Sequence, residues 1–152
     1  MDIKLRPVAT VKNSRKAPSD DFWEAVTTEI ELAEDIPADA FEGITAFSHL
    51  EIIFYFDRVG DNTVVFSGYP RGNAAFPRMG IFAQRKKDRP NKIGLTTVEL
   101  LGHKGRSITV RYLDAIDGTP ILDIKPVFRE FQPKKEIRQP AWVEALMKNY
   151  WR

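Results

Sequence analysis

The residues best suited to binding chemistry lie between Arg71 and Lys92, where seven basic residues stand against one acid. The local net charge of +6 contrasts with +2 for the whole chain, so the remainder carries about −4. Glycines and prolines interrupt the stretch too often for one long helix, which puts its cations on loops between short strands. Cationic loops on a rigid scaffold are suited to binding anions. The basic residues are Arg71, Arg78, Arg85, Lys86, Lys87, Arg89 and Lys92.

Two arginines of this stretch, Arg85 and Arg89, are the strongest candidates for holding a ligand. A planar guanidinium binds a carboxylate or phosphate through two parallel hydrogen bonds, which an ammonium cannot do. The alternative is a solvated surface, because runs of charge are usually solvated. Cysteine is absent, which excludes disulfides and thiolate chemistry, and no glycine-rich nucleotide loop opens a helix. A nucleotide-like cofactor would therefore have to be held by other loops.

Several short segments alternate apolar and polar residues, as strands with one buried face do. We expect strands at 5–12, 25–32, 50–56, 63–66, 79–83, 95–101, 107–113 and 120–127, and tight turns at 60–62 and 102–105. One helix is indicated, after Pro140, where apolar residues recur every three to four positions. Roughly seven or eight short strands without helices between them predict a mainly β fold. The expected architecture is a small closed or nearly closed antiparallel β-barrel with a short C-terminal α-helix.

The length of 152 residues and the 43% hydrophobic content suit one domain with a sizeable core. We expect residues 1–131 to form the barrel, and residues 132–152 to form a linker and a helix packed on the same domain. The first residues lack the apolar centre of a signal peptide, and no run approaches the roughly 18 apolar residues of a membrane span. These features predict a soluble cytoplasmic protein that does not contact a membrane.

Two motifs resemble the signatures of one known family. Residues 80–95 read GIFAQRKKDRPNKIGL, and residues 113–126 read LDAIDGTPILDIKP. In this order they are similar to the two signatures of the TrmO-like (TsaA/YaeB) family, and weaker agreement extends over most of the chain up to about Phe128. The resemblance implies a β-barrel methyltransferase that uses S-adenosyl-L-methionine, forms a homodimer with the cofactor near the subunit interface, and acts on tRNA.

The resemblance also implies which residues bind the cofactor. Arg85 matches the arginine of the first signature and Leu95 its last leucine, while residues 115–118 form the turn of the second. Asp57 and Arg58 follow the predicted strand 50–56, at the place where family members usually carry a histidine and a variable residue. Without the resemblance, the sequence indicates only that Leu95 is a core strand residue and that residues 115–118 form a turn between strands. The predicted cofactor-binding residues are Asp57, Arg58, Arg85, Leu95, Ala115, Ile116, Asp117 and Gly118, and no catalytic residue or metal ligand is identified.

Five other cations of the stretch are predicted to bind RNA, and the leading hypothesis is N6-methylation of threonylcarbamoyladenosine in tRNA. Residues 19–24 replace the P-R-Q that many family members carry, so a cofactor contact there must use other groups. One alternative is a non-catalytic RNA-binding barrel in which Tyr69, Phe76 and Phe82 stack on bases. Another is a methyltransferase acting on a small molecule. The predicted RNA-binding residues are Arg71, Lys86, Lys87, Arg89 and Lys92.

Overall fold

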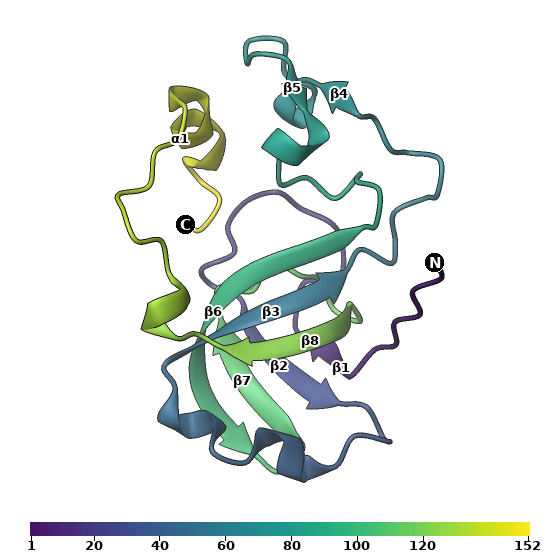
Figure 1. Cartoon of the computed structure of the whole chain (residues 1–152), viewed down its shortest axis with the longest axis vertical. Helices are drawn as coiled ribbons and strands as arrows, with labels where there is room; N and C mark the ends of the chain where they lie inside the picture. The colour runs from purple at the N-terminus through teal and green to yellow at the C-terminus, as the bar shows by residue number, and fades with distance from the viewer.

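The computed structural model describes residues 1–152, and its centre is a closed barrel of six strands (Figure 1). The strands follow the order β1-β2-β7-β6-β3-β8 around the barrel, and every neighbouring pair is antiparallel. The predicted fold class is confirmed. The strands are β1 (Ala9–Lys12), β2 (Thr27–Leu32), β3 (His49–Tyr55), β6 (Ile93–Lys104), β7 (Ser107–Arg111) and β8 (Pro120–Pro126).

The alternating pattern of the sequence lines the barrel interior. In β3, Leu50, Ile52 and Phe54 are buried while the residues between them are partly exposed. The other strands contribute in the same way, and 14 buried apolar residues form one continuous core. Burial of apolar surface is the main favourable term in folding, so this core is what holds the loops at the two ends of the barrel in place.

The segments outside the barrel cover its two ends. In Figure 1 the strands β4 (Ser67–Gly68) and β5 (Met79–Gly80) and the helix α1 (Ala141–Met147) lie above the barrel. The short 3-10 turns η1 (Ala38–Phe41) and η2 (Ile44–Ala46) lie below it. Three further 3-10 turns are η3 (Pro70–Gly72), η4 (Ile81–Ala83) and η5 (Arg129–Phe131).

The C-terminal residues are joined to the barrel by backbone pairing. The N–H groups of Phe22, Trp23 and Glu24 donate to the carbonyl oxygens of Asn149, Tyr150 and Trp151 at 3.0, 3.0 and 2.8 Å. Farther out, the rings of Phe76 and Trp142 lie 6.2 Å apart. The backbone bonds connect the end of the chain to the loop between β1 and β2, and the ring contact connects α1 to the segment between β4 and β5. None of the chain's helices combines the length and the apolar character needed to cross a membrane.

Three local predictions were wrong. Residues 63–66 form no strand, because the Thr63 hydroxyl donates to the Gly60 carbonyl and closes a turn, and Phe66 stays 69% exposed with no neighbouring strand to cover it. The β6–β7 turn lies at residues 105–106 rather than 102–105, since β6 continues to Lys104 past a bulge. The strand expected at 79–83 ends at Gly80 and continues as η4.

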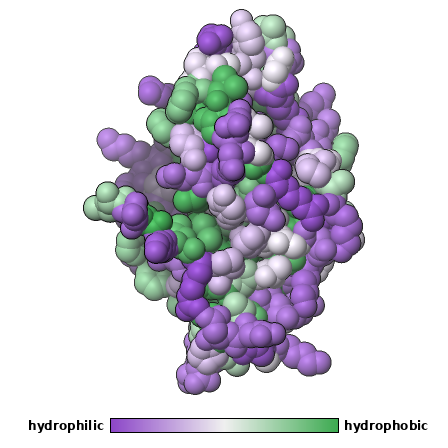
Figure 2. Space-filling model, turned by 90° about the vertical axis from the view of Figure 1, so that its right-hand side faces the viewer, coloured by the Kyte–Doolittle hydropathy of each residue, from purple (hydrophilic) through white to green (hydrophobic).

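Large apolar side chains are exposed on several parts of the surface. The face shown in Figure 2 is mostly hydrophilic and carries separate hydrophobic patches. Over the whole chain, the exposed fractions include 83% for Phe82, 69% for Phe66 and 45% for Leu95. Phe82 and Leu95 belong to the first motif, so part of the exposed apolar surface is formed by residues that the sequence analysis singled out.

Candidate cofactor site

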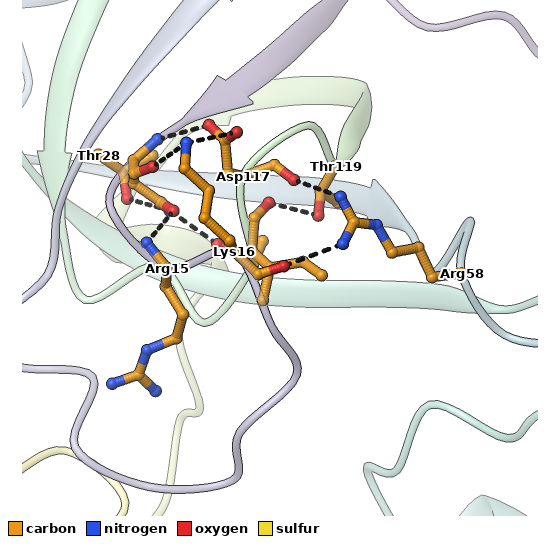
Figure 3. A network of polar contacts seen from close by, with 9 residues as sticks. Arg15, Lys16, Thr28, Arg58, Asp117 and Thr119 are labelled. Atoms are coloured by element: carbon orange, nitrogen blue, oxygen red, sulfur yellow. Dashed lines mark hydrogen bonds and ion pairs between the residues drawn. The ribbon is translucent and has the colours of Figure 1, made fainter.

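A polar network at one end of the barrel is centred on the turn between β7 and β8 (Figure 3). The Asp117 carboxylate accepts the backbone N–H of Asn13 at 3.0 Å and pairs with the Lys16 ammonium at 2.7 Å. Hydrogen bonding to Lys16, followed by that to Asn13, lowers the pKa of Asp117 below its ordinary value. The Asn13 amide donates to the Ala115 carbonyl at 2.9 Å and to the Thr28 hydroxyl at 3.0 Å. The turn is therefore fixed to the loop that follows β1.

Arg58 joins a third segment to this network. Its guanidinium donates to the carbonyls of Lys16 at 2.9 Å and Asp117 at 3.3 Å. Gly118 has a φ of +83°, a left-handed conformation that suits glycine, and a Cβ there would lie 3.9 Å from the guanidinium. The structure thus gathers Arg58 and residues 115–118, although Arg58 is engaged in holding loops together. Asp57 stands beside them, exposed to solvent.

The other two predicted cofactor residues, Arg85 and Leu95, contact each other. Arg85 follows η4, is exposed, and donates from its guanidinium to the Leu95 carbonyl on β6. A guanidinium has five N–H donors, so several stay available for a ligand. Gln84, which stands where the family signature has threonine, is buried and donates to the Met79 carbonyl at 2.9 Å.

A partly buried hydroxyl–carboxylate cluster connects these two groups. The hydroxyl of Thr96, the neighbour of Leu95, donates to one oxygen of Asp114, the neighbour of Ala115. The hydroxyl of Tyr150 donates to the other oxygen. Burial, and then the Asp114 charge, raises the pKa of Tyr150 above its ordinary value, so the hydroxyl stays protonated and able to donate. We call Thr96, Asp114 and Tyr150 the Asp114 cluster.

Sequence analysis did not identify the Asp114 cluster. In the sequence, Tyr150 belongs only to the apolar pattern that follows Pro140, and Thr96 only to the strand predicted at 95–101. The carboxylates of Asp114, Asp117 and Asp123 bind separate partners and do not form a common cation site, and Asp123 pairs with Lys125 at 3.1 Å. No group of three or more His, Cys, Asp or Glu residues in the chain could hold a metal ion.

Some of the predicted RNA-binding cations bind partners within the chain, and others have free charged groups. Arg71 pairs with Asp21 at 3.0 Å, and Arg89 donates to the Gln84 carbonyl at 3.0 Å. Lys92 is only 8% exposed; its ammonium donates to Asp61 at 2.5 Å and to the Val59 carbonyl at 2.9 Å. These three side chains hold the loop in shape. Of the five predicted RNA-binding cations, Lys86 and Lys87 are the two whose charged groups make no ion pair or hydrogen bond within the chain.

A cavity of about 320 Å³ lies between the barrel and the turns η1 and η2. Most of its lining is apolar, and it contains none of the predicted cofactor residues. It is therefore separate from the polar network of Figure 3. The apolar lining includes Val8, Leu32, Ile36, Phe41, Ile44 and Ile124.

Comparison with known proteins identifies the family. The family model of the tRNA-methyltransferase O (TrmO) N-terminal domain matches residues 9–132. The chain belongs to this family. A TrmO crystal structure, 26% identical, superposes with a TM-score of 0.73 over 91% of this chain, and TrmO from Pseudomonas aeruginosa, 25% identical, with 0.71 over 91%. The chain spans 64% and 62% of those two proteins.

Curated relatives of this TrmO-domain protein carry two kinds of name. A probable S-adenosyl-L-methionine-binding protein of Methanothermobacter thermautotrophicus is 35% identical over 134 residues, which cover 86% of this chain and 93% of the relative. The tRNA (adenine(37)-N6)-methyltransferase of Escherichia coli is 46% identical over 96 residues, which cover 59% of this chain and 40% of the enzyme. The relative of similar length is thus named for cofactor binding, and the longer one for tRNA methylation.

The groups at this end of the TrmO-type barrel fit S-adenosylmethionine in their chemistry. The Arg85 guanidinium suits the carboxylate of the methionine part, and exposed apolar side chains such as Leu95 suit the adenine. The backbone N–H groups of Ala115 and Ile116 donate no hydrogen bond within the chain. Trp23 Nε1 is buried without an acceptor, in the segment that stands where many family members carry P-R-Q. A buried unpaired donor costs about 1–3 kcal/mol, which a ligand acceptor would offset.

Proposed function

We propose that the chain is an S-adenosyl-L-methionine-dependent methyltransferase that methylates N6 of a modified adenosine, threonylcarbamoyladenosine, in tRNA. The observation that carries the proposal is the family match over residues 9–132. It is supported by the gathering of residues 115–118 with Arg58, and by the Asp114 cluster that connects this turn to Leu95 and hence to Arg85. A cytoplasmic location, where tRNA is modified, remains a prediction.

S-adenosylmethionine supplies a methyl group bonded to a positively charged sulfur. Displacement at that carbon needs alignment of the donor and the acceptor nitrogen more than acid–base assistance. In the proposed site, the fork of Arg85 orients the cofactor carboxylate, while Leu95 and Phe82 present apolar surface to the adenine. The free N–H groups of Ala115 and Ile116 donate hydrogen bonds that orient the nucleoside part of the cofactor. These residues bind and orient, and no side chain is assigned to accept the proton that N6 loses.

The homodimer is the second part of the proposal. On the outer side of the barrel, Leu95 of β6 lies beside Ile53 of β3, and Ile93 beside Tyr55. Leu95 is 45% and Ile93 36% exposed, so a single chain leaves this strip open to water. A second copy would cover the strip and close the exposed side of the Arg85–Leu95 pair. Light scattering should give twice the 17.4 kDa chain mass, and a monomer mass at micromolar concentration contradicts the dimer.

The RNA contact is the third part. Lys86 and Lys87 follow Arg85 directly, and their ammonium groups have no partner within the chain, so they can neutralise phosphates without breaking existing contacts. Arg71, Arg89 and Lys92 act indirectly in this proposal, since their contacts shape the loop that carries the two lysines. Such weak, salt-sensitive phosphate contacts position the RNA but do not recognise its sequence.

Calorimetric titration with S-adenosylmethionine, followed by transfer of labelled methyl groups to tRNA, tests the proposed function. We expect binding, and labelling of tRNA that carries threonylcarbamoyladenosine but not of tRNA lacking that modification. Binding of tRNA without cofactor binding supports the non-catalytic barrel instead. Cofactor binding without label in any tRNA, together with label in a small-molecule fraction, supports the small-molecule methyltransferase.

A further inference from the structure

The C-terminal residues 149–151 reach the candidate site although they lie outside the family match, which ends at residue 132. Their carbonyls accept the N–H groups of Phe22, Trp23 and Glu24. The side chain of Tyr150 continues inward to Asp114, and Trp151 packs edge-on against Tyr112 with ring centroids 5.9 Å apart. The segment therefore contacts the loop between β1 and β2 and the residues that directly precede the turn 115–118.

We propose that Tyr150 is a positioning residue of the cofactor site, and that residues 149–151 form one wall of that site. The inference rests on the proposed function, because it assigns Tyr150 to the same cofactor. Tyr150 does not touch the predicted cofactor residues itself. It acts through Asp114, whose two oxygens are held by Thr96 on one side and Tyr150 on the other.

The geometry explains why one hydroxyl matters. Asp114 directly precedes Ala115, and Thr96 directly follows Leu95, so the Asp114 cluster sets the spacing between the turn and β6. Without the Tyr150 hydroxyl, one carboxylate oxygen of a partly buried group loses its donor and must turn toward water or another donor. The backbone after Asp114 would turn with it, and the free N–H groups of Ala115 and Ile116 would lose their alignment.

The chain offers a matched control for this hydroxyl. Tyr112 belongs to the same aromatic group, packs on Trp151, and places its hydroxyl 3.4 Å from the Glu24 carboxylate. Tyr112→Phe therefore removes a hydroxyl that faces a carboxylate from the same region without touching Asp114. If the two hydroxyls had a purely structural role, the two variants would bind S-adenosylmethionine with similar affinity.

Titration of S-adenosylmethionine into wild type, Tyr150→Phe and Tyr112→Phe is the first test, with the thermal midpoint of each variant measured in parallel. Residues of one hydrogen-bonded network couple strongly, so we expect the Kd to rise about 5-fold or more in Tyr150→Phe, which is about 1 kcal/mol, and to stay unchanged in Tyr112→Phe. Unchanged affinity in Tyr150→Phe overturns the inference, and so does an equal loss in both variants. If wild type itself does not bind the cofactor, the proposed function fails instead.

Hydrogen exchange on wild type provides a second test that depends on no variant. Adding S-adenosylmethionine should slow amide exchange in residues 149–151 and in their partners at 22–24. Residues 38–46, at the other end of the barrel in Figure 1, serve as the internal control and should not change. Binding that leaves exchange in residues 149–151 unaltered shows that the segment is not a wall of the site and overturns the inference.

Discussion

Gly94, the second glycine of the first motif, serves packing rather than cofactor contact, and Gly94→Ala tests this. A Cβ at this position would lie 2.4 Å from Cε2 and 2.5 Å from Cζ of Phe54. The Phe54 ring is 2% exposed and stands edge-on to Phe56, with ring centroids 5.3 Å apart, so it has no open space to move into. The added methyl group must therefore displace either the ring or strand β6.

Overpacking of this kind typically costs about 1–3 kcal/mol. For a domain of about 150 residues, each kcal/mol lowers the melting temperature by about 2–4 °C, so we expect a fall of about 2–12 °C in Gly94→Ala. Gly102→Ala is the matched control, because Gly102 lies on the same strand and a Cβ there meets nothing within 4 Å. That variant should change stability by less than about 0.5 kcal/mol.

Thermal unfolding followed by circular dichroism measures both variants. A second comparison isolates the ring: in a Phe54→Leu background, Gly94→Ala should cost less than in wild type, because the smaller side chain vacates the space. If Gly94→Ala melts at the same temperature as Gly102→Ala, the packing argument is refuted. If it melts normally but no longer binds S-adenosylmethionine, the glycine is needed for the cofactor rather than for Phe54.

Three further predictions follow from the site. Arg85→Ala should weaken S-adenosylmethionine binding about 10-fold or more in calorimetry, with partial recovery in Arg85→Lys, whereas equal affinity in Arg85→Ala and Lys87→Ala contradicts the role of Arg85. Replacing Lys86 and Lys87 with glutamine should reduce the slope of log RNA affinity against log salt by about 1.4, at about 0.7 per phosphate contact, and an unchanged slope rules out this RNA surface. Asp117 has a folded pKa below its unfolded value, so its stabilising effect is present above that unfolded value, about 3.9, and is lost at lower pH. Denaturant titrations should therefore show Asp117→Asn less stable than wild type at neutral pH and similar to it near pH 2, whereas a constant difference contradicts the assignment.

Much of the barrel could be predicted because each strand carries its own signal. Burial of one face imposes the alternation of apolar and polar residues within a few positions, as in β3, and no distant partner is needed to read it. The failures occur where that signal is misleading. Val65 and Phe66 read as strand residues, yet they are 52% and 69% exposed, so their apolar character does not report burial in the barrel.

The candidate site was predicted in part for a related reason. The turn 115–118 and Arg85 lie within contiguous motifs, so they could be located from the sequence. The Asp114 cluster depends on contacts between residues far apart in the chain, such as Tyr150 with Asp114 at a separation of 36 residues. The engagement of Lys92 was equally hidden, because its partner Asp61 lies 31 residues away and carries no motif. Charge can be counted from a sequence, whereas its neutralisation by a distant partner cannot.

The distribution of those charges bears on how donor and acceptor could meet. Seven cations in one stretch repel one another, and the fold relieves this by giving Arg71, Arg89 and Lys92 partners within the chain. Three consecutive residues, Arg85 to Lys87, then stand on the loop that leads to β6. In the proposed function the first binds the cofactor and the other two bind RNA phosphate. Because neighbouring residues are about 3.8 Å apart, the methyl donor and the RNA would be held at the same edge of the barrel, which direct transfer between them requires.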